Sequence, residues 1–350
     1  MGGCWTEGFE THQQAVQWDR KYASRSGSWG MATAGRVFGQ AGTIAAPVFV
    51  TPSLPNGLQD IMGVAFGVRF ASQVAGVNSG AQGFYFERGA GNEQVHLEFV
   101  CNAGSFEVRV MRGATQLGIT TQTFAYASWH HFELKVTIHP STGAYELRHN
   151  TVNVLSGSGV NTAATGSSQA DVFAMRFSTT STNAAFDDIA VWDGSGSRNN
   201  DFLGDVEIKG MVPNGVGAST QWTNDAGTGS NWQNVDDDGG SAPDETGAGG
   251  TNSSDTSGQK DLYTYTDLSN VQGAILFVQV DTQMAMAAVG SRSVKSKYRD
   301  DGGTEADIAT HSVSSPLYDS FNAVLDQNPA TATSWDVTDL NDGQFGVEVV

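Results

Sequence analysis

The clearest pattern in this sequence is an alternation of apolar and polar positions with a period of two residues. It runs through residues 95–101 and 106–110, which are separated by a short turn at 102–104. A second hairpin follows, with alternating segments at 132–138 and 145–147 around a turn that contains Gly143. Because successive side chains of a strand point to opposite faces, these segments predict half-buried antiparallel strands.

The same period recurs at intervals through the first half of the chain. Further strands are expected at 60–70, 83–88, 173–177 and 186–192. No segment of helical period and confident length lies between them. Strands at this spacing without intervening helices predict an all-β fold, a sandwich of two antiparallel sheets.

The stretch 186–208 organises the chain. Ile189 and Val191 form one face of a strand, a turn rich in Gly, Ser and Asn follows, and a second apolar alternation starts at Phe202. The strand is expected to close one domain and the segment after the turn to open another. We therefore predict a first domain at 1–198 and a second β domain at 199–350.

The second half contains a long low-complexity loop and several shorter strands. The loop covers about 224–260, and strands are expected at 261–266, 291–299 and 345–349. The nearly continuous apolar run at 273–280 predicts a buried central strand. A short helical turn is expected at 331–340, around Trp335 and Leu340.

Composition supports this class and narrows the partners. Of 350 residues, 39% are hydrophobic and only 16% charged, with 43 glycines, as in turn-rich all-β proteins. The formal net charge of −19 disfavours nucleic-acid binding, because phosphate backbones are repelled. The basic residues of 292–299 recur at strand period and are interpreted as a solvated strand face. No apolar run approaches the length of a membrane span, so no membrane insertion is expected.

Two cysteines, Cys4 and Cys101, leave two states open. They could pair in a disulfide, which the sequence alone does not show. A reduced, partly buried thiol is the simpler interpretation and the one that we prefer.

Carboxylates raise the question of a bound cation. Calcium binds several oxygen ligands, and the candidates are Asp187, Asp188, Asp193 and the run 236–238. Asp187 and Asp188 are expected on opposite faces of one strand, so both would not easily join one site. The alternative is that one of them accepts backbone N–H groups in a turn while the other is solvated. Calcium is the one cofactor considered, and none is required.

Catalytic motifs are missing from the sequence. Glycoside hydrolysis uses two carboxylates on the order of 5–10 Å apart. The strands offer Glu98 opposite Glu107 and Glu133 near Glu146, and neither pair gives an acidic motif on a single face. The histidines at 130, 131, 139 and 149 surround one hairpin, but neighbours on a strand face opposite ways, so no zinc pair is expected. We expect a protein that is not an enzyme.

Carbohydrate binding would use exposed aromatic side chains on a concave sheet or at loop tips. The candidate platforms are Trp192, Trp222, Trp232 and Tyr126. Aromatic residues in sandwiches are more often part of the core, which is the competing interpretation.

Several phrases resemble known families. WHHFELKV at 129–136 and YELRHN at 145–150 look like the central hairpin of concanavalin A-like (laminin G-like) jelly rolls, and FDDIAVWD at 186–193 is similar to their final strand. NNDFLGDV at 199–206 and GQKDLY at 258–263 are more specific. Together with QWT at 221–223 and the closing FGVEV, they resemble tailed-bacteriophage virion proteins in which a lectin-like jelly roll precedes a second β domain.

The resemblance implies a role and a setting. The protein would be a non-enzymatic structural component displayed on the virion surface: a tail, fibre or collar appendage, or a capsid decoration. It would be assembled in the host cytoplasm and would contact other virion proteins. By resemblance alone it would form a homo-oligomer, commonly a trimer, and aid adhesion to the host surface. The alternative is a carbohydrate-binding module that recognises a host surface glycan, and a glycan-degrading enzyme ranks below both.

Overall fold

The structure is a computed structural model that describes residues 2–8, 24–32, 35–36, 41–51, 53–72, 83–177, 184–225, 229–236 and 250–350. Contacts within the chain divide it into two compact units, and among the described residues the division falls between Ile208 and Lys209. Residues 199–208, expected in the second domain, belong to the first unit. They are tied there by hydrogen bonds such as that from the Ile208 amide to Asp188.

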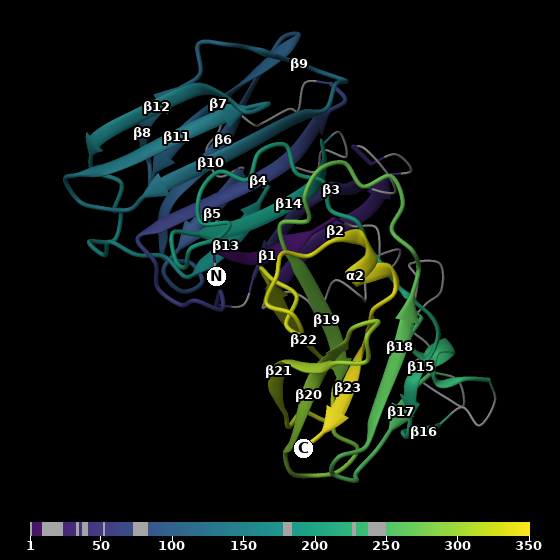
Figure 1. The fold of residues 1–350 in the computed structure, drawn as a ribbon. Helices are drawn as coiled ribbons and strands as arrows, with labels where there is room; N and C mark the ends of the chain where they lie inside the picture. Colours follow the sequence, from purple (N-terminus) through teal and green to yellow (C-terminus); the bar gives the residue numbers. More distant parts are fainter. Residues whose placement is uncertain are drawn as a thin grey trace. The chain divides into compact units, whose positions relative to one another are not determined.

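Unit 1 is built from one long antiparallel sheet (Figure 1). Its strands are β1 (Gly3–Glu7), β2 (Ser24–Ala32), β3 (Ala41–Val50), β4 (Ile61–Phe70), β5 (Gly83–Glu87), β6 (Glu93–Asn102), β7 (Ser105–Arg112), β8 (Thr115–Ile119), β9 (Phe124–Ala125), β10 (His130–Thr137), β11 (Gly143–His149), β12 (Val152–Val160), β13 (Val172–Arg176) and β14 (Ala184–Asp193). The main path runs β12-β11-β10-β4-β14-β3-β13-β5-β6-β7-β8, with β1 on β14, β2 on β3 and β9 on β7.

The sheet folds onto itself around a core of phenylalanines. Phe66 of β4 lies 4.1 Å from Phe84 of β5, between ring centroids, although these strands are far apart in the sheet order. Phe106 of β7 likewise meets Phe132 of β10 at 6.4 Å. Contacts between distant strands of one sheet require two facing layers, so the all-β sandwich prediction is confirmed. The inward residues are the apolar positions of each alternating segment.

The unit's outward face is therefore set by the polar half of the same pattern. In β7 the exposure alternates along the strand, with Phe106, Val108 and Val110 buried and Glu107 and Arg109 partly exposed between them. Strands β5 and β6 depart from this rule, because polar residues on their outward side are buried as well. Buried polar side chains therefore gather on the outward face of these two strands.

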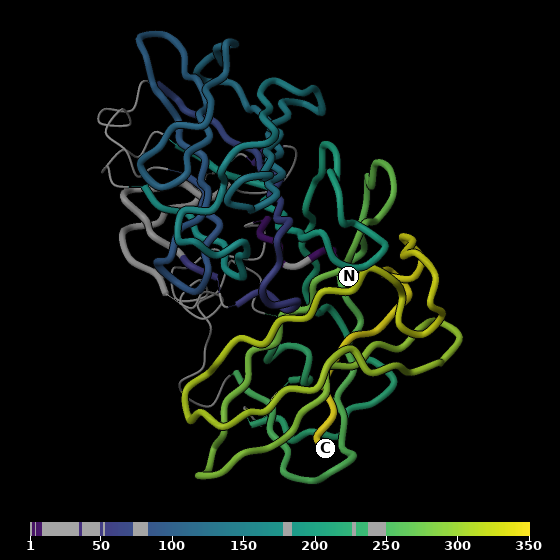
Figure 2. The backbone as a smooth tube through the Cα atoms, turned by 90° about the vertical axis from the view of Figure 1, so that its left-hand side faces the viewer, coloured from purple at the N-terminus to yellow at the C-terminus, as the bar shows by residue number. Residues whose placement is uncertain are grey.

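Unit 2 contains a five-stranded sheet of order β15-β18-β23-β20-β21, a β19–β22 pair and a β16–β17 pair. The elements are β15 (Pro213–Thr220), β16 (Thr223–Asn224), a short 3₁₀ helix η1 (Asn231–Asn234), β17 (Asn252–Ser253), β18 (Lys260–Tyr265), β19 (Val278–Met284), β20 (Arg292–Arg299), β21 (Glu305–Val313), β22 (Asp319–Leu325), α2 (Val337–Asn341) and β23 (Gln344–Val349). The last strand, β23, lies in the middle of its sheet, and in Figure 2 the yellow segment that ends the chain runs among other segments of unit 2.

Two expectations for unit 2 need correction. The apolar run 273–280 is not a buried central strand: β19 begins only at Val278, pairs with β22 alone, and most of the run is half-buried or exposed. The predicted loop at 224–260 contains η1, β17 and the last residue of β16, and β18 begins at its final position. Residues 226–228 and 237–249 lie outside the described residues.

The remaining general expectations concern the cysteines and the membrane. Cys101 is a buried thiol in β6, whereas the side chain of Cys4 lies outside what the structure describes. Within the described ranges, no helix has both the length and the apolar character needed to cross a membrane.

Candidate functional site

The four aromatic residues proposed as glycan platforms are not gathered in one place. Trp192 is fully buried in β14, where its indole fills the space left by Gly63 on β4, so it is a core residue and not an exposed platform. Tyr126 is half-buried, stacks on Phe106 and donates its hydroxyl to the Asn102 carbonyl at 2.8 Å. Both residues are held by unit 1 itself.

The other two aromatic candidates belong to unit 2. Trp222 packs beside the buried cluster around Met284 and donates its indole N–H to the Gln259 carbonyl at 3.2 Å. Trp232 is half-buried in η1. Neither forms an aromatic pair with another described residue, so the aromatic-platform prediction names single side chains rather than a site.

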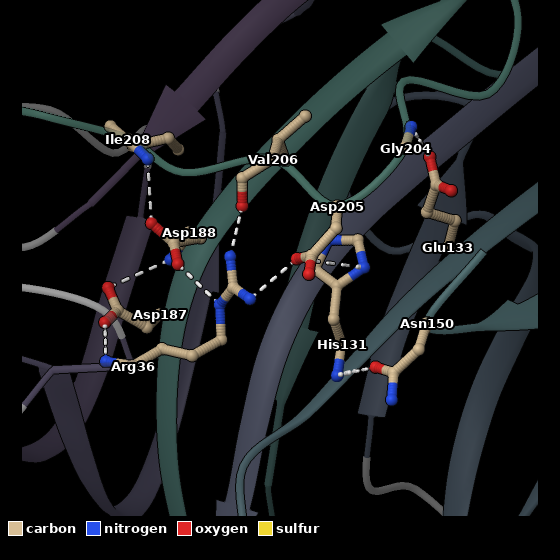
Figure 3. A network of polar contacts seen from close by, with 10 residues as sticks. All are labelled: Arg36, His131, Glu133, Asn150, Asp187, Asp188, Gly204, Asp205, Val206 and Ile208. Atoms are coloured by element: carbon tan, nitrogen blue, oxygen red, sulfur yellow. Dashed lines mark hydrogen bonds and ion pairs between the residues drawn. The ribbon is translucent and has the colours of Figure 1, made fainter. Parts of the chain in front are cut away.

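The three carboxylates proposed for calcium are buried, and Figure 3 shows two of them, Asp187 and Asp188. A β-bulge between Asp187 and Ala190, with Asp188 at a φ of +50°, interrupts the strand. The bulge brings Asp187 and Asp188 to one partner, contrary to the expectation that they face opposite ways. The main-chain N–H of Arg36 donates to Asp187 at 2.6 Å, and its Nε donates to Asp188 at 2.7 Å.

A guanidinium therefore sits where a cation was expected. Arg36 also donates from Nη1 to Asp205 at 2.6 Å and from Nη2 to the Val206 carbonyl. Asp193 lies apart from this group, accepting from Asn56 and from the Ser195 amide, each at 2.8 Å. In the part of the chain that the structure describes, no three His, Cys, Asp or Glu side chains are arranged to hold a metal ion. Of the run 236–238, residues 237 and 238 lie outside the described residues.

The same network fixes residues 199–208 on unit 1 (Figure 3). Glu133 accepts from the amides of Leu203 and Gly204 at 2.8 and 3.0 Å, and burial raises the pKa of this carboxyl although those bonds oppose the change. Beside it, His131 is buried with Nδ1 3.9 Å from Asp205, and neither ring nitrogen has a hydrogen-bond partner among the described residues. Burial lowers the pKa of His131 to about 4, so its ring is neutral near pH 7.

The strand registers correct one of the two carboxylate pairs considered from the sequence, because Glu98 lies opposite Arg109 rather than Glu107. Glu133 lies opposite Arg148, and Glu146, opposite Lys135, is the diagonal neighbour of Glu133. Of the hairpin histidines, His130 and His149 do meet, at 3.1 Å between ring nitrogens, inside an aromatic cluster with Phe124 and Phe132. Burial lowers the pKa of both, which fits packed, neutral rings.

A different set of side chains forms a pocket on the outward face of β5, β6, β7 and β13. Its volume is about 530 Å³, within the range of small-molecule sites, roughly 300–1,000 Å³. The turn between β7 and β8 forms part of the lining. The lining residues are Tyr85, Glu93, His96, Glu98, Arg109, Met111, Gly113, Ala114, Gln116 and Arg176.

The register explains why these residues meet. Tyr85 is opposite His96, and His96 is opposite Met111, which gives one row across three strands. The adjacent row on the same face runs from Arg176 through Gly83 and Glu98 to Arg109. Gly83 contributes no side chain to this row, because a Cβ there would lie 1.6 Å from the Leu97 carbonyl oxygen, so only glycine fits.

His96 is the centre of the pocket's polar contacts. Its ring stacks on Tyr85 at 4.4 Å, and its nitrogens lie 2.5 Å from Glu93 and 3.0 Å from Glu98. Burial opposes the charged ring, but the bonds to the two carboxylates outweigh it and raise the pKa of His96. The imidazolium is thus favoured where Glu93 and Glu98 face it.

Two guanidiniums flank this centre. Arg109 donates from Nε to Glu98. Arg176 donates hydrogen bonds to both carboxylate oxygens of the fully buried Glu87, one of them at 2.9 Å. The Arg176 guanidinium also lies 5.0 Å from the centroid of the Tyr85 ring. The Tyr85 hydroxyl is buried without a hydrogen-bond partner, and burial followed by the nearby carboxylates raises its pKa, so it stays protonated.

Sequence reasoning missed this pocket because its residues are spread from 85 to 176. A signal was present in the outward positions of the hairpin, where His96 and Glu98 alternate with core residues and Arg109 follows on the next strand. Finding the pocket from that signal would have required the register of β5 and β13.

Comparisons with known proteins give a limited result. No protein-family model matches the chain, and no curated protein matches it. Domain 4 of AbnA, a GH43 extracellular arabinanase from Geobacillus stearothermophilus, in complex with arabinotriose, is similar over 55% of this chain and 93% of its own, at 12% identity and a TM-score of 0.36. Alginate lyase Aly36B is similar over 55% and 97%, at 14% identity and a TM-score of 0.32. A Trypanosoma rangeli sialidase is similar over 49% and 29%, at 10% identity and a TM-score of 0.32. Likenesses this weak carry no argument about function.

Proposed function

We propose that this protein binds carbohydrate, and that the pocket between β5, β6, β7 and β13 is the binding site. The observation that carries the proposal is the pocket itself, which is lined by the hydrogen-bonding side chains of glutamate, histidine, arginine and glutamine residues. Sugars present several hydroxyl groups, and side chains of these types can donate hydrogen bonds to them or accept hydrogen bonds from them. The pocket is large enough for a small ligand, at about 530 Å³.

A matched pair of bulky substitutions tests the location. Ala114, exposed in the β7–β8 turn, lines the pocket, whereas Ala103, exposed in the β6–β7 turn, does not. We expect the native protein to bind part of a broad glycan panel, Ala114→Trp to lose at least tenfold in affinity, and Ala103→Trp to bind as the native protein does. Equal effects of the two variants would place binding elsewhere, and no binding by the native protein would refute the function.

A glycan-degrading activity is the alternative that the same pocket raises. The pocket contains two carboxylates, those of Glu93 and Glu98, which the sequence analysis did not pair. Both carboxylates bond to one imidazole, and Glu98 is also held by Arg109, an arrangement that supports binding rather than proton donation by either acid. Release of reducing ends from a bound glycan, abolished by Glu98→Gln, would favour the enzyme instead.

For the setting of this function we propose the surface of a bacteriophage virion, where the protein would be a non-enzymatic structural component that aids adhesion. Support comes from the sequence motifs that resemble phage virion proteins and follow one another along the chain, such as NNDFLGDV at 199–206. That phrase contains Asp205 and Gly204, which bind Arg36 and Glu133 and so join the segment to unit 1. Labelled antibody against unit 1 should decorate intact particles, and unlabelled particles would refute this placement.

A further inference from the structure

We propose that the pocket selects a saccharide that carries a carboxylate, such as a uronate or a sialate. The inference rests on the proposed carbohydrate binding and adds the ligand's charge. The reason is that most carboxylates of the pocket wall already accept hydrogen bonds within the protein, whereas its guanidiniums keep N–H groups that a ligand can use.

The carboxylates that could hold sugar hydroxyls are mostly engaged. Both oxygens of Glu87 accept from Arg176, and one also accepts from the Gly91 amide at 2.8 Å. Glu98 is bound at one oxygen by His96 and at the other by Arg109. Glu93 is the exception, because within the described ranges only one of its oxygens is bonded, to His96.

The guanidiniums, in contrast, keep spare donors. A guanidinium has five N–H groups. Arg109 bonds to the described residues from Nε alone, so both of its Nη groups remain. Arg176 uses one N–H from each Nη, and its Nε remains. Their side chains are 20% and 23% exposed, so ligand can reach them. A wall with surplus donors fits a ligand rich in acceptors.

The charge balance points the same way. Glu87, Glu93 and Glu98 are matched by Arg109, Arg176 and the imidazolium of His96, although the chain as a whole carries −19. This wall therefore lacks the repulsion that the rest of the protein presents to anions. Guanidinium forks bind carboxylates in two-point geometry, which neutral hydroxyls match less well.

The position of the two cations also favours an extended ligand. Three strand spacings separate Arg176 from Arg109 along one row, on the order of 14 Å between their backbones. A short oligosaccharide lying across the strands would meet a cation on each side of the pocket.

The test compares one ligand in two forms. The full chain is screened on a panel of uronate, sialylated and neutral glycans, and the tightest acidic ligand is then titrated before and after chemical reduction of its carboxyls to alcohols. We expect acidic glycans to dominate the panel and carboxyl reduction to weaken binding at least tenfold. Equal affinity for the two forms, or binding of neutral glycans only, would overturn the charge selectivity while leaving carbohydrate binding intact. No binding to any glycan would refute the proposed function itself.

A matched pair of variants tests the residue assignment. Arg109→Gln and Arg112→Gln lie on the same strand and each remove one positive charge, but Arg112 does not line the pocket and bonds to Asn161 and Thr115. We expect at least a tenfold loss for Arg109→Gln with the acidic ligand and less than twofold for Arg112→Gln. Equal losses would indicate general electrostatic attraction and overturn the assignment. A thermal melt of each variant confirms folding, and the ligand comparison above needs no variant.

Discussion

Unit 1 contains two clusters of charged side chains, the Arg36 network and the pocket, which have similar compositions. They differ in how many guanidinium N–H groups are bonded within the chain. In the Arg36 network the guanidinium donates from Nε and from both Nη groups, and the main-chain N–H beside it is bonded as well. In the pocket, Arg109 donates from Nε alone. A guanidinium whose donors are used within the chain holds the fold together, whereas one with donors to spare is available to a ligand.

The two clusters also hold their histidines in opposite states. Burial keeps His131 neutral in the network, with a pKa of about 4, because it outweighs the carboxylate of Asp205, 3.9 Å from Nδ1, and the charge of Arg36 acts in the same direction as burial. His96 in the pocket has two carboxylates within 3.0 Å, and its pKa is raised despite burial. A low pH should therefore destabilise the Arg36 network by protonating His131. A high pH should change the pocket by deprotonating His96.

The largest effect is expected from breaking the network at Arg36. Arg36→Met would leave the buried carboxylate of Asp188 without its guanidinium, and losing one partner of a buried ion pair costs about 3–5 kcal/mol. The free energy of unfolding, measured by urea titration, should fall by about that amount. Arg112→Gln serves as the control, with a change within about 0.5 kcal/mol. A loss below about 1 kcal/mol for Arg36→Met would show that the network is not structural.

The next effect concerns acid and His131. Its pKa is lower in the folded chain, about 4, than in the unfolded chain, about 6.5, so the unfolded state binds more protons between these values. The contribution of neutral His131 to the free energy of unfolding is therefore complete above pH 6.5. It is lost as the pH falls through about 4, and the loss amounts to roughly 3 kcal/mol.

His131→Phe isolates this contribution. The ring nitrogens have no hydrogen-bond partners, so the substitution removes the titration without breaking a bond. Urea titrations at pH 7 and pH 4.5 should show a smaller loss of stability on acidification for the variant than for the native protein. Parallel losses in both would mean that His131 does not titrate with unfolding.

The sequence predicted the strands of the fold better than it predicted the two charged clusters. The alternation at 95–101 and 106–110 was sufficient for β6 and β7, because one buried face imposes the period. It was insufficient at Asp188, where a bulge changes the direction of the side chain, and for Arg36, which is 152 residues away in sequence. Periodicity describes one strand at a time, and both charged clusters depend on register between distant strands.

A smaller effect is expected from alkali at the pocket. Because the pKa of His96 is raised on folding, its contribution is complete below the unfolded value and is lost as the pH rises through the raised value. The raised pKa values of Tyr85 and Arg176 keep their charge states unchanged there, so deprotonation of His96 leaves Glu93 and Glu98 less compensated. Affinity for the acidic glycan should fall several-fold across this range, measured by calorimetry. His96→Gln should flatten the profile, and an unchanged slope would contradict the assignment.

The smallest effect is expected at the hydroxyl of Tyr85. It is buried without a partner, so Tyr85→Phe should leave stability unchanged or raise it by up to about 1 kcal/mol. Tyr145 is the matched control, because its hydroxyl donates to the Leu117 carbonyl at 3.0 Å. Tyr145→Phe should lose about 1 kcal/mol in the same urea titration. A larger loss at Tyr85 than at Tyr145 would reveal a hydrogen bond that the pocket depends on.

The most direct test of the central claim, that the pocket and not the network binds ligand, uses methionine methyl resonances. Met111 lines the pocket, whereas Met62 is fully buried in β4, the strand that pairs with β14 of the network. With ¹³C-methyl methionine in the full chain, titration with the tightest acidic oligosaccharide of the panel should shift Met111 saturably and leave Met62 unchanged. Binding that shifts Met62, or that leaves Met111 unmoved, would contradict the account.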